Sequence, residues 1–271
     1  MQRYFRGGQE PDVSLPVIQP SFAADPAREL TITWLGHSAV VVELDGVRIL
    51  TDPMLSERAS PFQAVGPKRF HVAPVEVADL PALDAVVISH DHYDHLDMDT
   101  VAALGALATR FIVPLGVGAH LEAWGVGSDR ITELEWWEQV NVDGVRVVCT
   151  PSRHFSGRGL TDRNRTLWAS WALIGSEQRV WFSGDTGPFP QVAEIGERLG
   201  PFDLTMIEVG AYDPAWDSVH MGPDAAVEMN AMVGGAALFP IHWGTFNLAA
   251  HRWDQPIVRL LDVAEVPVMA P

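Results

Sequence analysis

The residues best suited to chemistry stand together in residues 89–97, which read Ser-His-Asp-His-Tyr-Asp-His-Leu-Asp. His90 and His92 are two positions apart, so their imidazoles point the same way if the chain is extended. Asp94 and His95 then turn toward a second position close by. Imidazole and carboxylate are ligands that suit zinc and similar divalent metals. The spacing therefore predicts a metal site, and four potential ligands so close together favour two ions over one.

The sequence around this segment predicts where it lies in the fold. Residues 84–88 form a short apolar run rich in β-branched residues, which is typical of a buried strand. Asp97 is expected to cap a helix that begins near Met98, with Asp99 in its first turn. The segment thus occupies a loop at the carboxyl end of a strand, where α/β proteins place their chemistry.

Three further side chains, His154, Asp185 and His242, each come soon after a predicted strand. Because they share this position with the first cluster, we expect all of them to converge on one edge of a sheet. The predicted ligands are His90, His92 and His154 for the first ion, Asp94, His95 and His242 for the second, and Asp185 as a bridge between them. His37 and Asp52 also stand at strand ends. For these two a turn or capping role is favoured over hydrogen bonding to a metal ligand.

The remaining pattern predicts one domain with a short arm. Residues 1–28 are rich in proline and polar residues and are expected to form an extended N-terminal arm, followed by a single domain over residues 29–271. Residues 30–50 read as an antiparallel meander with a hairpin at Asp45. Helices are expected over 98–108, 114–124, 190–199, 223–232 and 254–263, with strands between them.

Composition limits the possible functions and partners. The 271 residues carry a formal net charge of −17, which disfavours nucleic acid as a partner and makes a nuclease an unfavoured alternative. The N-terminus leads into no apolar stretch of signal-peptide or membrane-spanning length, so neither secretion nor a transmembrane segment is expected. Cys149 is the only cysteine, which excludes an internal disulfide and favours a reducing, cytoplasmic location. It is expected to be a buried apolar residue.

Several residues are candidates to contact a substrate. Trp136, Trp216 and Phe246 are candidates to line a cleft beside the metals, together with the proline-rich loop 56–74. Ordinary packing is the alternative for the tryptophans. Arg153 stands near His154 and is followed by three more arginines, so these side chains are candidates to bind an anionic group. A solvated loop remains the favoured reading of this arginine-rich segment.

These motifs together resemble the metallo-β-lactamase superfamily, and within it the family of N-acyl-phosphatidylethanolamine-hydrolysing phospholipases D and their bacterial relatives. The matching stretches run in order from about residue 30 to residue 250. They are Trp34-Leu35-Gly36-His37, Leu50-Thr51-Asp52-Pro53, Gly66-Pro67-Lys68-Arg69-Phe70, residues 90–97, Trp136-Trp137-Glu138, residues 150–154, residues 183–187, residues 200–204, Gly210-Ala211-Tyr212 and residues 241–246.

The resemblance implies a fold, a cofactor and a mechanism. The implied fold is α/β, a four-layer αβ/βα sandwich of two mixed sheets flanked by helices. The implied cofactor is a pair of Zn²⁺ ions, for which Mn²⁺ or Fe²⁺ are conceivable substitutes, held by the ligands named above. It also implies that His220 lies in the active site, where it would contact the substrate or protonate the leaving group. A hydroxide shared by the two ions would attack, with Asp185 bridging the metals and Asp94 orienting the nucleophile.

The favoured reaction is hydrolysis of a small or lipid-like phosphodiester, as in a phospholipase D. Hydrolysis of a lactone or β-lactam at the same site is the second interpretation, and a non-catalytic metal-binding sensor is the third. The sequence leaves open the natural substrate, the physiological metal, any contact with membranes and the oligomeric state, including a homo-oligomer.

Overall fold

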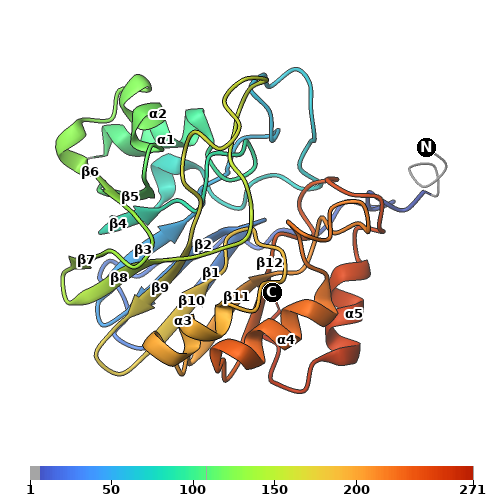
Figure 1. Ribbon diagram of the computed structural model, residues 1–271. Helices are drawn as coiled ribbons and strands as arrows, with labels where there is room; N and C mark the ends of the chain where they lie inside the picture. The colour runs from blue at the N-terminus through green and yellow to red at the C-terminus, as the bar shows by residue number, and fades with distance from the viewer. Residues whose placement is uncertain (1–6, 108, 271) are drawn as a thin grey trace.

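The computed structural model describes residues 7–107 and 109–270. Two six-stranded sheets lie face to face, and helices cover the outer face of each sheet (Figure 1). This is the predicted four-layer αβ/βα sandwich, so the expected fold class is confirmed.

The first sheet is built from the N-terminal half of the chain, in sequence order. Its first three strands are antiparallel, and the hairpin at Asp45 and Gly46 has the positive φ angles of 53° and 81° that a tight turn between strands requires. The later strands are parallel. The strands are β1 (Thr31–Gly36), β2 (Ala39–Leu44), β3 (Val47–Thr51), β4 (Ala85–Val87), β5 (Phe111–Pro114) and β6 (Ile131–Leu134).

The second sheet is built from the C-terminal half and has the order β12-β11-β10-β9-β8-β7. Followed along the chain, its first four strands form an antiparallel meander, and its last three strands are parallel to one another. The strands are β7 (Gln139–Val142), β8 (Val145–Thr150), β9 (Ser170–Ile174), β10 (Arg179–Phe182), β11 (Leu204–Glu208) and β12 (Leu238–Ile241). Both sheets are mixed, as the resemblance implies.

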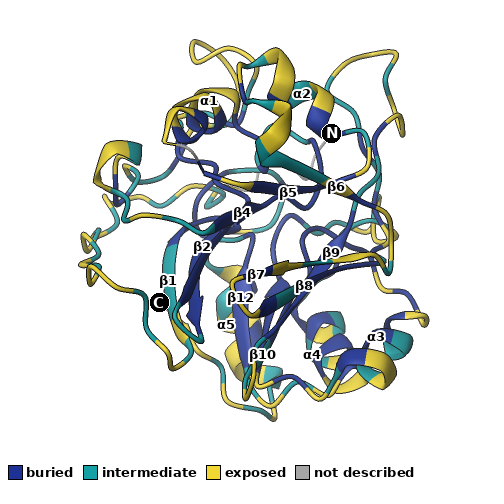
Figure 2. Cartoon of the chain, turned by 90° about the vertical axis from the view of Figure 1, so that its left-hand side faces the viewer, coloured by how far each residue is buried: buried dark blue, intermediate teal, exposed yellow. Residues whose placement is uncertain are grey.

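Burial on both faces explains the apolar runs in the sequence. Valines and leucines of the two inner faces form the central core, and separate apolar clusters lie under the helices. Figure 2 shows the buried strands between exposed helical faces. The helices α1 (Met98–Ala106) and α2 (Gly118–Ala123) cover the first sheet, whereas α3 (Val192–Leu199), α4 (Pro223–Val233) and α5 (Gln255–Val263) cover the second.

Some local predictions need correction. The helix expected over 114–124 begins only at Gly118, because Pro114 ends β5 and Gly116 turns the chain with a φ of 89°. Asp97 precedes α1 as predicted, but its carboxylate makes no cap hydrogen bond to the helix backbone. It accepts instead from the Ser56 amide and the Thr100 hydroxyl.

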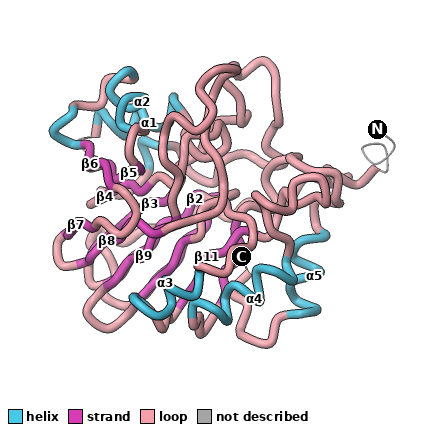
Figure 3. The backbone as a smooth tube through the Cα atoms, in the orientation of Figure 1, coloured by secondary structure: helices cyan, strands magenta, loops and turns pink. Residues whose placement is uncertain are grey.

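The arrangement of strands brings distant loops together. The strands β4, β8, β10, β11 and β12 all end at the same edge of the sandwich, and the long connections gather there (Figure 3). Among the helices within residues 7–107 and 109–270, none has the length and apolar character needed to cross a lipid bilayer.

Candidate metal centre

One group of potential ligands is formed by the two leading histidines of the loop after β4, by His154 after β8 and by Asp185 after β10. Their ligand atoms lie within 4.8 Å of one another. His92 Nδ1 is 2.8 Å from His90 Nε2 and 3.2 Å from His154 Nε2. Asp185 Oδ2 lies 3.9 Å from His90 Nε2 and 3.8 Å from His154 Nε2. The residues predicted for the first ion are therefore neighbours in space.

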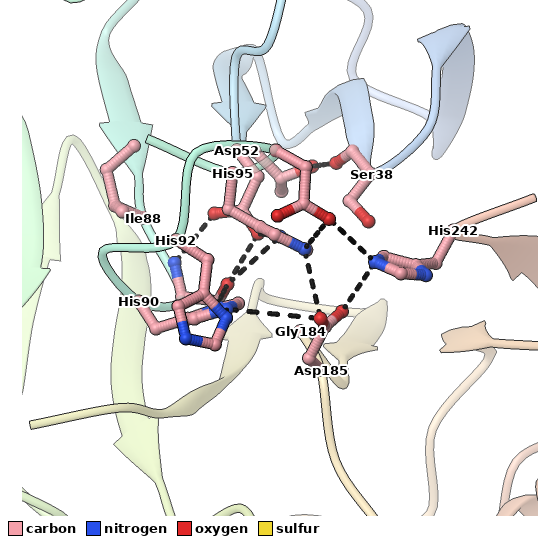
Figure 4. A network of polar contacts seen from close by, with 12 residues as sticks. Ser38, Asp52, Ile88, His90, His92, His95, Gly184, Asp185 and His242 are labelled. Atoms are coloured by element: carbon pink, nitrogen blue, oxygen red, sulfur yellow. Dashed lines mark hydrogen bonds and ion pairs between the residues drawn. The ribbon is translucent and has the colours of Figure 1, made fainter. Parts of the chain in front are cut away.

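The second group lies on the other side of Asp185. His242 Nε2 is 3.2 Å from Asp185 Oδ1 and 3.2 Å from Asp94 Oδ2. His95 Nε2 is 3.1 Å from Asp185 Oδ2. Figure 4 shows Asp185 between His90 on one side and His242 on the other. The carboxylate thus lies between the two groups and is close to both.

The donor atoms in these groups fit divalent metal ions. His95 Nε2 and Asp185 Oδ1 are fully buried, and although they lie near other polar atoms, none within the described chain is aligned to hydrogen-bond them. Buried polar atoms normally have a partner. Imidazole and carboxylate donors that point at a shared space suit borderline divalent metals. The chemistry of the two groups therefore supports metal binding.

Asp52 fixes the orientation of one ligand. Its carboxylate accepts hydrogen bonds from the Ser89 amide at 2.6 Å and from His95 Nδ1 at 2.6 Å. This bond turns His95 Nε2 toward the cluster, as a carboxylate commonly does for a metal-binding histidine. The turn role favoured for Asp52 from sequence is incomplete, because this side chain contacts a ligand directly.

His37 plays a similar part for Asp94. Its backbone has a φ of 56°, so the predicted turn is present, but His37 Nε2 also lies 3.0 Å from Asp94 Oδ2. Burial lowers the pKa of His37 to about 3, and the neighbouring His242 adds to this effect. A neutral His37 donates from Nε2 to the Asp94 carboxylate and holds it in place.

The central charges stabilise one another. Burial alone would raise the pKa of Asp185, but the adjacent His242 and His95 hold that pKa well below its usual value. Burial would likewise lower the pKa of His242, yet the Asp185 carboxylate raises it to about 10. Asp185 is therefore ionised, as a metal ligand must be.

Glu208 is a buried acid of the site that the sequence analysis missed. It is the last residue of β11, it is completely buried, and its carboxylate accepts from His220 Nδ1 at 2.9 Å and from the Thr186 amide at 2.6 Å. Burial raises the pKa of Glu208. Burial would lower the pKa of His220, but the Glu208 carboxylate raises it overall. The signal in the sequence that could have found Glu208 is its place at the end of an apolar strand, close to the positions of the other site residues.

A cleft of about 360 Å³ opens above both groups. Its lining combines polar and apolar side chains. The polar ones are His92, Asp94, Asp185, His220 and His242, and the apolar ones are Phe155, Ala211, Trp216, Val219 and Leu248. Of the substrate-contacting candidates named from sequence, Trp216 lines this cleft.

The other candidates lie elsewhere. Trp136 is 37% exposed and donates from Nε1 to the Trp168 carbonyl. Arg153 donates to the Pro188 carbonyl at 2.9 Å. Phe246 is buried and packs edge-on against His37 with ring centroids 5.2 Å apart. The structure does not bring these three side chains into the cleft lining.

Arg158 attaches the arginine-rich loop that follows His154 to the metal-binding loop, residues 89–97. Its Nη1 donates to the Asp91 carbonyl at 2.7 Å and to the Leu96 carbonyl at 2.8 Å, near both ends of that segment. Its guanidinium lies 4.1 Å from the ring centroid of Tyr93, whose hydroxyl donates back to the Arg158 carbonyl. The Asp91 carboxylate accepts from the Gly157 amide at 2.7 Å. The Arg158 side chain thus holds these two loops together.

Comparisons with known proteins agree with this geometry. The family model described as the beta-lactamase superfamily domain matches residues 47–243. An uncharacterised protein of Mycobacterium tuberculosis is 53% identical over 259 residues, which cover 94% of this chain and 69% of the relative. The N-acyl-phosphatidylethanolamine-hydrolysing phospholipase D 1 of Caenorhabditis elegans is 45% identical over 237 residues, covering 83% of this chain and 66% of that protein.

Solved structures share the fold at low sequence identity. A possible metal-dependent hydrolase from Veillonella parvula has a TM-score of 0.71 at 18% identity, with 90% of this chain and 97% of that chain covered. An isothiocyanate hydrolase from Delia radicum gut bacteria has a TM-score of 0.70 at 21% identity, with coverages of 89% and 95%.

Proposed function

We propose a reaction on the premise that this chain belongs to the metallo-β-lactamase superfamily, whose family model and relatives it matches. It is a metal-dependent hydrolase that uses two Zn²⁺ ions to cleave a phosphodiester bond in a lipid-like substrate. The single observation that carries this proposal is a cleft of about 360 Å³ whose lining joins side chains of both ligand groups to five apolar side chains.

The cleft favours a substrate with an apolar portion beside the scissile bond. Phe155 and Trp216 form apolar parts of its wall, beside the polar side chains of the ligand groups. Burial of apolar substrate surface against such walls contributes roughly 25 cal/mol per Å². The C. elegans relative is named for the hydrolysis of a phospholipid, which supports the same substrate class for this chain.

The residues divide the work of such a hydrolysis. His90, His92 and His154 would hold one ion, Asp94, His95 and His242 the other, and Asp185 would contact both. Two Zn²⁺ ions there would supply Lewis acidity and lower the pKa of bound water toward about 7. Asp94, fixed by His37, would orient the attacking water.

His220 would assist the leaving group. Its Nδ1 is held by Glu208, which leaves Nε2 as the ring nitrogen available for the cleft that His220 lines. The Glu208 carboxylate favours the protonated ring and raises the pKa of His220. A protonated His220 could then donate to the departing oxygen.

Turnover by the zinc-loaded protein tests this proposal. We expect hydrolysis of bis-p-nitrophenyl phosphate and of a diacyl phosphodiester, with little turnover of nitrocefin or a homoserine lactone. His92→Ala and Asp185→Asn should each lower kcat/KM by at least about 100-fold, the range known for electrostatic groups at reaction centres.

Arg153→Ala is the matched control, since this side chain binds the Pro188 carbonyl outside the cleft. It should leave kcat/KM within about twofold of the parent, as expected for a change away from the reaction centre. Full activity of Asp185→Asn, or a preference for the lactone, would refute the assignment.

A further inference from the structure

The starting observation is an unpaired nitrogen on one of the central histidines. His242 directs Nε2 toward Asp94 and Asp185, while its Nδ1 is fully buried and has no hydrogen-bond partner among the described residues. Histidines that bind metals almost always donate their second ring N–H to a carboxylate, carbonyl or water. In this site Nδ1 of His95 and of His154 have such partners, the Asp52 carboxylate and the Val219 carbonyl.

A small cavity is lined by His242 itself. It has a volume of about 10 Å³, and its lining includes His242, Phe246, Asn247, His251 and Trp253. A cavity of roughly 10–15 Å³ holds one water molecule, provided that polar partners surround it. His251 supplies such a partner, because its Nε2 is also buried without a hydrogen bond.

The protonation of both rings can be worked out from their other contacts. His251 Nδ1 lies 2.8 Å from the Arg252 carbonyl, which only accepts, so Nδ1 carries the proton and Nε2 offers a lone pair. If Nε2 of His242 faces a metal, its Nδ1 carries a proton and is a donor. The two residues that carry this buried donor and this buried acceptor therefore line the same small cavity.

We propose that one buried water connects these two rings, accepting from His242 Nδ1–H and donating to His251 Nε2. His251 is then a positioning residue that sets the orientation of His242 without touching the metals or the substrate. The inference rests on the proposed metal-binding role of His242, but it does not depend on which bond is hydrolysed.

The surroundings of His251 suit this role. Its ring stacks on Tyr212, with centroids 4.6 Å apart and an angle of 21° between planes. The segment is fixed from outside, because the Trp253 amide donates to the Gly8 carbonyl at 3.0 Å. A ring held on one face and at one nitrogen can present its second nitrogen to the cavity in a constant direction.

Metal retention tests the proposal without any substrate. The zinc-loaded His251→Phe variant should release zinc to a competing chelator with an apparent affinity about 10- to 100-fold weaker than the parent, the effect typical of losing such a partner. His251→Gln keeps a polar end toward the cavity and should recover part of that loss. Tyr212→Phe is the control, since it keeps the stacked ring and loses only the hydroxyl that binds Gln255.

A second measurement uses the unmodified protein. In the zinc-loaded parent with ¹⁵N-labelled histidines, His251 should show a protonated Nδ1 and an unprotonated, hydrogen-bonded Nε2. A proton on Nε2 of His251, or zinc retention by folded His251→Phe equal to that of the parent, would overturn the link. A protein that retains zinc as expected but cleaves no phosphodiester would refute the proposed function and leave this inference standing.

Discussion

At the scale of single residues, several side chains of the site are held by hydrogen bonds from residues that are not predicted ligands. Asp52 and His37 hold a histidine and an aspartate of the cluster, and Glu208 holds His220. These hydrogen bonds fix the orientation of buried side chains that lie close together.

Glu208→Gln tests one of these contacts. The substitution keeps the shape of the side chain but removes the charge that favours protonated His220. We expect kcat to fall by about 10- to 100-fold with zinc content unchanged, as is typical for partners outside the ligand set. Steady-state kinetics with metal analysis measures both. A variant that instead loses zinc would show that Glu208 supports metal binding and not only the protonation of His220.

At the scale of elements, the metal-binding loop depends on a loop more than sixty residues away in sequence. Arg158 bonds two carbonyls of that segment, while the Asp91 side chain binds the Gly157 amide. The pair of loops is therefore a single structural unit.

Arg158→Ala should destabilise this unit. Losing two charge-assisted hydrogen bonds and the contact with Tyr93 should lower the free energy of unfolding by about 2–3 kcal/mol. Hydrogen exchange should also increase over residues 90–97. Arg163→Ala on the same loop removes only a guanidinium stacked on Phe155 and serves as the control. Equal exchange in both variants would contradict the coupling.

The sequence predicts the elements, and which residues gather at their ends, better than it predicts side-chain contacts. The histidine spacing and the strand-end positions of His154, Asp185 and His242 predict one shared site, because parallel strands end at one sheet edge. Phe246 and Trp136 could not be placed in this way. Whether an aromatic side chain faces a cleft or the core depends on backbone turns that apolar character does not encode.

The arginines also show that the sequence does not predict which partners a side chain contacts. The sequence predicts that they are close to His154, but Arg158 finds carbonyl partners in a loop distant in sequence. Glu208 was overlooked because one acid after a strand has no local partner that marks it. Its partner His220 is twelve positions further along the chain.

At the scale of the whole molecule, metal binding should raise thermal stability. A ligand at 100 times its dissociation constant stabilises the native state by about 2.7 kcal/mol. For a protein of this length that corresponds to a rise in Tm of roughly 5–10 °C. Thermal unfolding with and without zinc measures it, and Mg²⁺, which prefers oxygen ligands, is the control. An unchanged Tm with excess zinc would argue against a metal centre.

Cys149 offers a measure of global unfolding. It lies in the core between the sheets with no exposed surface, and burial raises the pKa of its thiol well above the usual value. We expect no reaction with a thiol reagent at pH 8 in the native state and one equivalent after denaturation. Rapid labelling of the native protein would show that the two sheets separate readily.

The order of the strands has one more consequence. The sheet that ends with β6 supplies His90, His92, Asp94 and His95, and the sheet that begins with β7 supplies His154, Asp185 and His242. Each proposed ion would therefore be held by ligands from both halves of the chain. A shift of one sheet against the other would weaken the binding of both ions at once. A change in the packing between the sheets, far from any ligand, should therefore lower the metal affinity.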